Sequence, residues 1–398
     1  MALPVTISSS LFPAQNYFCG PFKSSGGNFY TVLRESSGIT PEVYKATDPT
    51  TSFSAQDAAN NPVNAATTLW AYQVGDVLHI VTYHDSATSD VVYYHTFNMA
   101  TDAWVTKDEV IESPKDTPGA TYMSGSIALR SDGDVIVLYN GDQDTVMGVD
   151  YQRVDYARKE VSTWTVGVAV DAAGEVNYSG ASVVLGASDR MHFFFTEVLS
   201  ATDRDVQHRS LSSANALDTV QDVDATASPT TAHLHYYASG VRYVSGANTV
   251  VKAVYIDGDG ELSSAEIAVS GADPTITTAT VVSDLSIRVV NGTPVACLAV
   301  DGTTTYLLYA DSSTSDLWRD SQTDGGAWGT DAEVLDAVII NRVSCAVYDR
   351  SGTKLAYVYD DGGTVKYNEV SLSVFDPVIA VPGFAQLSSC GFVGRRVI

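Results

Sequence analysis

Seven glycine-containing turns recur along the chain, each joining two short apolar runs. Successive turns are about 46 to 60 residues apart, and the mean period between Gly27 and Gly352 is about 54 residues. A period of this length is typical of repeat architectures, in which no unit can bury its apolar faces alone and each must stack on its neighbours. The turns are Ser25-Gly26-Gly27-Asn28, Val74-Gly75-Asp76, Ser131-Asp132-Gly133-Asp134, Gly186-Ala187-Ser188-Asp189, Ser245-Gly246-Ala247-Asn248, Asn291-Gly292-Thr293 and Ser351-Gly352-Thr353.

A segment rich in β-branched and aromatic residues follows each turn. We assign these segments as the second strands of a repeating sheet, because such runs bounded by turn residues favour strands. They cover residues 28–33, 77–83, 135–139, 191–196, 250–256, 295–300 and 354–359. One position of the third strand carries a recurring tyrosine, which favours packing between repeats over a ring of sugar-binding platforms. These tyrosines are Tyr44, Tyr94, Tyr151, Tyr306 and Tyr367.

The pattern predicts an all-β protein, a seven-bladed β-propeller with four-stranded antiparallel blades. No segment sustains the i, i+3, i+4, i+7 apolar spacing of an amphipathic helix, and seven sheets close into a ring without a long open edge. Six blades are the alternative, because the first repeat is the least regular. We expect an N-terminal arm at residues 1–15, the propeller at 16–372, and a closing strand or attachment tail at 373–398. Ring closure would bring Cys19 and Cys390 close, so a disulfide between them is left open.

Charge and hydropathy exclude several kinds of partner. The 398-residue chain has 22 Lys and Arg against 47 Asp and Glu, a formal net charge of -25. Such a charge argues against nucleic acid and against anionic membrane surfaces, and no apolar run reaches the length of a membrane span. The start of the chain lacks the basic residues and apolar core of a secretory signal. We therefore expect a protein made in the cytoplasm without a signal peptide.

One segment resembles a known propeller motif. The run Arg319-Asp320-Ser321-Gln322-Thr323-Asp324-Gly325-Gly326-Ala327-Trp328 is similar to a degenerate Asp-box, the Ser-x-Asp-x-Gly-x-Thr-Trp turn of sialidase-like (BNR-type) propellers. The acid is shifted by one position, and Ala327 replaces the threonine. The resemblance implies a propeller fold shared by glycosidases, polysaccharide lyases, lectins and structural proteins, and it does not choose among them.

Candidate ligand-binding residues lie in the loops between second and third strands and in the loops that lead into the innermost strands. In a propeller these loops surround the mouth of the central channel. Imidazole, phenol, carboxylate and guanidinium groups there would suit a polysaccharide, with Tyr or His as base and Arg holding a carboxylate. Acids are so abundant in these loops that a carboxylate pair carries little information, and we assign no catalytic residue. The candidates are His84, Asp85, Tyr122, Glu197, His233, His235 and Arg342.

We assign further polar residues to the same face but do not select them as candidates. Two arginines, Arg242 and Arg288, also fall at equivalent positions of their repeats, four residues before the turn glycine. The further polar residues are Asn140, Asp142, Asp257, Asp259, Asp284, Asp301, Asn341, Asp360 and Asp361.

The sequence predicts no cofactor and no metal centre. The run Asp257-Gly258-Asp259-Gly260-Glu261 is similar to the start of a calcium loop, since oxygen ligands alternate with glycine, but the rest of a calcium-binding loop is missing. A tight turn is the favoured interpretation, and a structural calcium ion is the alternative. His233 and His235 have no evident third ligand.

Three classes of function remain. The main prediction is a non-enzymatic virion surface or structural protein of a bacteriophage or other virus, a capsid decoration or a tail- or fibre-associated propeller used for assembly or adhesion. Its partners would be other virion structural proteins and host cell-surface glycans. This class agrees with the missing catalytic signatures and with a negative surface that keeps crowded copies soluble. The alternatives are a carbohydrate-active enzyme of sialidase-like or polysaccharide-lyase type, and a lectin-like glycan-binding module.

Overall fold

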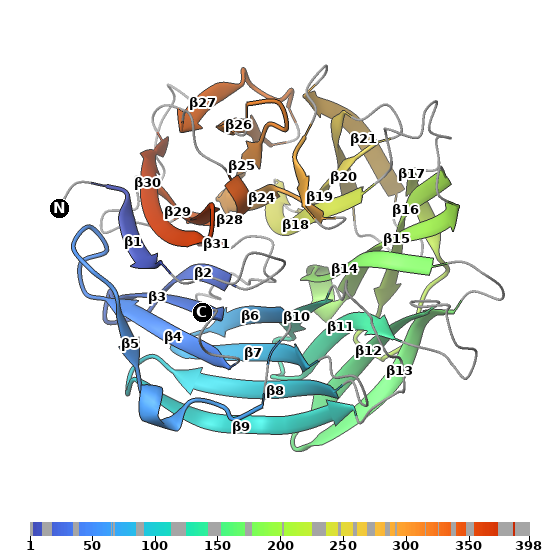
Figure 1. Cartoon of the computed structure of the whole chain (residues 1–398). Helices are drawn as coiled ribbons and strands as arrows, with labels where there is room; N and C mark the ends of the chain where they lie inside the picture. The colour runs from blue at the N-terminus through green and yellow to red at the C-terminus, as the bar shows by residue number, and fades with distance from the viewer. Residues whose placement is uncertain are drawn as a thin grey trace.

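Seven four-stranded antiparallel blades surround a central axis in the computed structural model of the chain (Figure 1). The prediction of a seven-bladed propeller is confirmed. The structure describes residues 3–9, 18–34, 40–64, 66, 68–84, 91–112, 125–141, 153–171, 177–200, 203–224, 236–245, 248–257, 261–268, 275–282, 287–290, 293–314, 316–324, 326–335, 340–347, 354–372 and 385–386. Among these residues, no helix has the length and apolarity needed to cross a bilayer.

Blades 1 to 4 each run from an innermost to an outermost strand in chain order. Blade 1 contains β2 (Phe18–Lys23), β3 (Phe29–Arg34), β4 (Pro41–Ala46) and β5 (Ser54–Gln56). Blade 2 contains β6 (Thr68–Val74), β7 (Val77–His84), β8 (Val91–Asn98) and β9 (Ala103–Glu112). Blade 3 contains β10 (Gly125–Leu129), β11 (Val135–Gly141), β12 (Arg153–Glu160) and β13 (Thr163–Asp171). Blade 4 contains β14 (Asn177–Leu185), β15 (Met191–Ser200), β16 (Asp203–Leu211) and β17 (Gln221–Asp224).

Blades 5 to 7 follow the same plan with additions at two edges. Blade 5 contains β18 (Tyr236–Ser245), β19 (Asn248–Ile256), β20 (Leu262–Ala268) and β21 (Thr275–Val282). Blade 6 contains β24 (Ala296–Asp301), β25 (Thr304–Ala310), β26 (Leu317–Thr323) and β27 (Ala332–Leu335), with β31 (Ala385–Gln386) on the inner edge. Blade 7 contains β28 (Ile340–Val347), β29 (Lys354–Asp361), β30 (Thr364–Ser371) and β1 (Val5–Ser8). Smaller elements are the pair β22 (Val289–Val290) and β23 (Thr293–Pro294) and the 3₁₀ turns η1 (Ala58–Asn60) and η2 (Ala187–Asp189).

The core lies between neighbouring blades. Each innermost strand contacts the innermost strand of the next blade around the whole ring. Along a second strand, alternate side chains face the two neighbouring blades, so both faces of a blade are buried. In β3, for example, Phe29 packs against Tyr367 of blade 7, with ring centroids 5.9 Å apart, while Tyr30 packs against Phe97 of blade 2. This two-sided burial explains the nearly continuous apolar runs after each turn.

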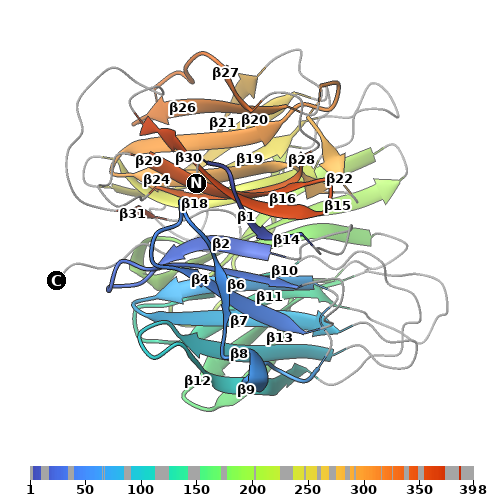
Figure 2. The same cartoon turned by 60° about the vertical axis from the view of Figure 1, so that its left-hand side comes forward.

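The ring is closed by the N-terminal strand. β1 pairs antiparallel with β30, with Val5 opposite Tyr367, and Figures 1 and 2 show it beside β30 at the outer edge of blade 7. Residues 1–15 were expected to form an arm, whereas the structure places Val5–Ser8 inside a blade. The physical reason is that residues 340–371 supply only three strands of blade 7, which leaves an open edge beside β30.

Residues 373–398 were predicted to form a closing strand or an attachment tail, and the structure describes only β31 within this segment. This strand pairs with the innermost strand of blade 6, with Val300 opposite Gln386, and not with the outer edge of blade 7. The other residues of this segment lie outside the described part of the chain.

The strand register of blade 6 differs from the prediction. Residues 295–300 were expected to form its second strand, but they overlap β24, the innermost strand, because the true turn is Gly302-Thr303, between β24 and β25. The short strands β22 and β23, which precede and follow residues 291–292 in the sequence, pair with each other. Tyr306 therefore lies in the second strand and not the third, and Asp301 lies at the opposite end of the ring from the predicted ligand face.

Serine–aspartate contacts join blade 1 to blade 2 and blade 3 to blade 4. In the first-to-second strand turn of blade 1, the backbone N–H of Ser25 donates to Asp76 Oδ1 of blade 2 (2.6 Å), and its hydroxyl donates to Asp76 Oδ2. Ser131 of blade 3 repeats both contacts with Asp189 of blade 4, at 2.9 and 2.5 Å. Each contact ties two turns that are distant in sequence.

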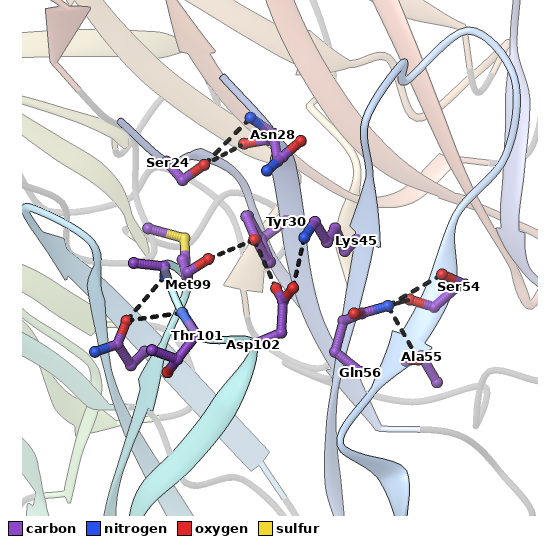
Figure 3. Close-up of polar contacts among 12 residues, drawn as sticks. Ser24, Asn28, Tyr30, Lys45, Ser54, Ala55, Gln56, Met99, Thr101 and Asp102 are labelled. Atoms are coloured by element: carbon purple, nitrogen blue, oxygen red, sulfur yellow. Dashed lines mark hydrogen bonds and ion pairs between the residues drawn. The ribbon is translucent and has the colours of Figure 1, made fainter. Parts of the chain in front are cut away.

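A second contact between blades 1 and 2 is centred on Asp102 (Figure 3). The Tyr30 hydroxyl of blade 1 donates to the Met99 carbonyl (2.7 Å) and to Asp102 Oδ1 (2.8 Å), in the turn before β9. Lys45 Nζ binds the other carboxylate oxygen at 2.5 Å. Asp102 has φ of 54°, a left-handed conformation that aspartate tolerates better than most residues. Blade 1 thus holds the outer turn of blade 2.

The outer edge of blade 2 is covered by the chain that enters this blade. Trp104 of β9 donates its backbone N–H to Asp57 Oδ2 and its indole N–H to Asn61 Oδ1, both at 3.1 Å. Asp108 accepts the backbone N–H groups of Val63 (2.9 Å) and Asn64 (3.1 Å). Residues 57–64 therefore satisfy part of an otherwise open edge.

Two of the four cysteines are described with their side chains. Cys19 carries a buried thiol rather than a disulfide, and its Sγ donates to the Leu69 carbonyl at 3.7 Å. Cys297 is buried in β24, as the sequence indicates. Cys390 lies outside the described residues.

Four histidines are held neutral inside blades 2 and 4. His192 Nδ1 lies 2.9 Å from His208 Nε2, so one ring must donate a proton and the other must accept it. The backbone N–H of Asp108 donates to His95 Nδ1 (3.0 Å), which keeps that nitrogen deprotonated. Burial lowers the pKa of His79 and of His95 to about 4 and that of His208 to about 3, and it holds the pKa of His192 well below its usual value.

The closing strand predicts a position-specific loss of stability. Ile7 is 7% exposed and packs in the apolar cluster between blades 7 and 1. Replacing Ile7 by Ala should lower the free energy of unfolding by about 2 kcal/mol, because it leaves a cavity at the closure. The control is Val105→Ala on the 68% exposed Val105 of β9, which should stay within about 0.5 kcal/mol of the parent. Equal urea-denaturation curves for the two variants would contradict closure by β1.

The neutral histidines predict a loss of stability in mild acid. Unfolded histidine binds a proton near pH 6.5, whereas these four side chains do so only near pH 4 or below, so stability is lost as pH falls through this window. Burial raises the pKa of Asp320 to about 6 and also raises the pKa of Asp331 and of Asp360, so these groups take up protons in the folded state and offset part of the loss. We expect stability still to fall with pH, by about 1 to 3 kcal/mol per pH unit near pH 5. Urea denaturation between pH 7 and pH 5 measures this slope. In His79→Gln the slope should fall by the contribution of about one proton. A parent protein whose free energy of unfolding does not change over this pH range would disprove the assignment of four neutral histidines.

Candidate functional site

The second strands end, and the innermost strands begin, at the same end of the ring. We call this end the entry face; it carries the ends of β3, β7, β11, β15, β19, β25 and β29 and the starts of β2, β6, β10, β14, β18, β24 and β28. His84 ends β7, Glu197 lies near the end of β15, and Arg342 lies near the start of β28. The other candidates, Asp85, Tyr122, His233 and His235, lie outside the described residues.

The three described candidates share the entry face but come from different blades. They belong to blades 2, 4 and 7, which are not neighbours in the ring. His84 is half-buried, and its buried Nδ1 has no hydrogen-bond partner in the described part of the chain. Glu197 Oε2 accepts a hydrogen bond from Gln207 Nε2 at 2.5 Å within its own blade. Arg342 lies beside a larger polar group.

Blades 6, 7 and 1 bring five side chains together near the start of β28. Arg288, ahead of the innermost strand of blade 6, donates from Nη2 to Asn341 Oδ1 at 2.7 Å. Asn341 in turn donates from Nδ2 to Asp360 Oδ2 at 3.2 Å. Arg342 places its guanidinium carbon 5.4 Å from the ring centroid of Phe18, at the start of β2. We call Phe18, Arg288, Asn341, Arg342 and Asp360 the axial cluster.

A β-bulge in β28 makes this arrangement. Ile340 pairs with Asp361 and Arg342 pairs with Asp360, so Asn341 is an extra residue without an opposite number. A bulge of this kind re-aims side chains at the end of a strand. Two consecutive residues, Asn341 and Arg342, consequently lie beside Asp360. Arg288 is held in place by its backbone, since its N–H donates to the Ala310 carbonyl at 2.9 Å.

The electrostatics of the axial cluster are set by the burial of Asp360. This carboxyl group is 4% exposed, and burial raises its pKa. The Gly363 backbone N–H (2.6 Å) and the Asn341 amide oppose that rise because they donate to the charged form. Asp361, the next residue, is paired with Lys366 Nζ at the same turn. The cluster therefore combines two guanidiniums, an amide, one carboxylate and an aromatic ring.

Sequence reasoning located most of this cluster but did not select it. Asn341 and Asp360 were assigned to the ligand face, and Arg288 was noted for its repeat position, yet only Arg342 was a candidate. The bulge that unites them leaves no signal in the residue pattern. Phe18 was missed because its segment reads as an ordinary apolar strand.

A tyrosine column at the end of the second strands was also missed. Each member is at most 3% exposed and lies just inside the entry face. The Tyr139 hydroxyl, for example, donates to Glu112 Oε2 of the preceding blade. Aligning the repeats at the ends of these strands, rather than at their turns, would have revealed the column. Its members are Tyr83, Tyr139, Tyr255, Tyr309 and Tyr359.

The proposed calcium loop is described only at its two ends. Asp257 caps a tight turn: its Oδ1 accepts the Glu261 backbone N–H at 3.0 Å, and its Oδ2 accepts the Ser263 hydroxyl at 2.7 Å. Asp259 lies outside the described residues. The described residues contain no group of three or more His, Cys, Asp or Glu arranged to hold a metal ion.

Solved structures similar to this chain are β-propellers. No protein-family model and no curated protein sequence matches the chain. An α-L-arabinanase from Penicillium chrysogenum, complexed with arabinobiose, is 10% identical with a TM-score of 0.51, covering 94% of this chain and 99% of its own. The α-L-arabinofuranosidase Arb93a from Fusarium graminearum is 12% identical with a TM-score of 0.50, covering 94% and 98%. The fucose-binding lectin of Aleuria aurantia is 12% identical with a TM-score of 0.45, covering 83% and 98%.

The likenesses to the arabinanase and the arabinofuranosidase support the β-propeller fold. They do not support the sialidase-like, Asp-box family that the segment at residues 319–328 resembles, nor a viral origin. In this chain the tryptophan of that segment joins two blades, because Trp328 Nε1 donates to Ser264 Oγ of blade 5 at 3.1 Å.

Proposed function

We propose that the protein binds a carbohydrate at the axial cluster. The observation that carries this proposal is the meeting of Arg288, Asn341, Arg342 and Asp360 beside the Phe18 ring at the entry face. Planar amide, carboxylate and guanidinium groups present paired donors and acceptors that match neighbouring sugar hydroxyls, and an aromatic ring offers an apolar wall. Propellers of similar fold include an arabinanase and an arabinofuranosidase, which makes arabinose-containing glycans the first ligands to test.

Binding is favoured over hydrolysis by the number of carboxylates. Glycoside hydrolysis ordinarily needs two carboxyl groups on either side of the bond, about 5 to 10 Å apart. Among the described residues, Asp360 is the one carboxylate of the axial cluster, and the neighbouring Asp361 is engaged by Lys366. A single carboxyl group can orient a hydroxyl, but hydrolysis ordinarily needs a second one as nucleophile, acid or base.

The virion-surface role predicted from the sequence has no support in the fold comparisons and stays a prediction. Glycan binding is compatible with adhesion, since host cell-surface glycans were among the expected partners. Mass spectrometry of particles from the source culture tests the viral prediction separately. Absence of the protein from such particles would remove that role and leave glycan binding unaffected.

The axial cluster predicts selective loss of binding in two variants. A glycan array followed by calorimetric titration should identify a ligand, and Arg342→Ala and Asn341→Ala should each weaken it by about tenfold or more, because buried hydroxyl contacts are lost. Arg158→Ala is the matched control, since Arg158 pairs with Glu160 on blade 3. Unchanged affinity in both cluster variants would refute the site, and release of reducing sugar from the bound glycan would refute binding without hydrolysis.

A further inference from the structure

The outer strand of blade 3, β13, is long and carries exposed valines. Among the described strands it pairs only with β12, and Figure 1 shows it at the outer rim of the ring. Val166 and Val168 are 39% and 38% exposed, and Val161, in the turn before the strand, is fully exposed. From Val161 to Val170 the sequence contains no charged residue and no proline. Charges and prolines are the usual means by which proteins keep an edge strand from pairing with another chain.

The other two long outer strands in the described part of the chain lack this combination. Residues 57–64 cross the edge of β9 and bind it through backbone N–H groups. β21 has 8 residues, of which four are threonine, and none of its described side chains is a large exposed hydrophobic one. β13 therefore combines length, an open edge and exposed apolar side chains.

The regular part of β13 presents its apolar side chains on one face. Trp164, Val166 and Val168 alternate along the strand, so they share one face of the sheet. The ladder with β12 is regular from Thr163 to Val168. The bulge follows at Ala169, which has no opposite residue in β12. A further strand can therefore pair along the regular stretch without meeting the bulge.

The charge of this edge favours an identical copy as its partner. The chain has a formal net charge of -25, so most of its surface repels a second copy. Residues 153–171, which contain β12 and β13, have three basic and three acidic side chains, so their net charge is 0. A basic partner would gain little at this neutral edge, whereas a second copy avoids the repulsion that it meets elsewhere. The charged residues are Arg153, Arg158, Lys159, Asp155, Glu160 and Asp171.

We propose that two copies of the chain pair antiparallel through β13, about a two-fold axis at Val166. An axis normal to the sheet keeps the same face of both copies on one side, so the same patch serves both partners. In this register Val166 lies opposite its own symmetry mate, and Val168 lies opposite Trp164 of the other copy. The three apolar side chains of each copy then form one cluster across the joint. The two blades become one continuous sheet.

The joint is independent of glycan binding at the axial cluster. β13 belongs to blade 3, whereas the axial cluster spans blades 6, 7 and 1, and blade 2 separates blade 3 from blade 1. A dimer therefore carries two axial clusters, and two linked binding sites hold a surface with repeated ligands more tightly than one site does.

Sedimentation velocity of the full chain over a range of concentrations tests the proposal. We expect a monomer–dimer equilibrium with a Kd of about 10 to 100 μM, as for a small transient interface. Val166→Lys and Val168→Lys should each weaken the dimer by about tenfold or more, because each places a charge in the apolar cluster. Urea denaturation of dilute samples checks that both variants fold.

Two control variants separate this edge from the rest of the molecule. Thr278→Lys adds the same charge at an exposed position of β21 and should leave the Kd of the dimer unchanged. Arg342→Ala alters the axial cluster and should also leave the dimer intact, so loss of glycan binding and loss of pairing are distinguishable.

Amide hydrogen exchange locates the joint on the chain. The outward-pointing backbone amides of residues 163–168 should exchange more slowly above the Kd than below it, while those of β21 stay the same. A monomer at all concentrations, a dimer unaffected by both valine variants, or open polymers would overturn the proposal. Protection of β13 at every concentration would overturn it too, because another part of the same chain would then cover the edge.

Discussion

Pairing between β1 and β30 is the contact on which the rest of the ring depends. It is the one contact that makes a blade from opposite ends of the described chain, and it converts a row of six blades and three strands into a closed circle. The axial cluster spans the seam between blades 7 and 1 directly, because Arg342 faces Phe18 there.

The repeat pattern predicted the architecture well because each blade repeats the same physical demand. Each blade has a tight turn, two strands buried on both faces and a tyrosine between blades. These features can be recognised in the sequence of a single repeat. The Asn291-Gly292-Thr293 segment misled the prediction in blade 6, because it precedes the true turn at Gly302-Thr303, between β24 and β25. Residue types alone cannot show which of two nearby Gly-containing segments joins the first two strands of a blade.

The sites were less predictable because they depend on contacts between repeats. Arg288 precedes β22, Asn341 lies in β28 and Asp360 lies in β29, and the three meet through one bulge. The sequence marked the Arg319–Trp328 segment for its resemblance to a family motif, whereas the contact of Trp328 with Ser264 of blade 5 is visible only with the neighbouring blade in place.

The covered edge of blade 2 bears on how the protein behaves when it is concentrated. A propeller exposes one outer strand per blade, and each is a template for edge-to-edge growth into aggregates. The outer strands β1, β5, β17 and β27 are only 3 to 4 residues long, too short to recruit another strand firmly. β9, at 10 residues the longest outer strand, carries residues 57–64 across it. The shortness of four outer strands and the segment that covers β9 together limit edge-to-edge association to blades whose outer strands are long and uncovered.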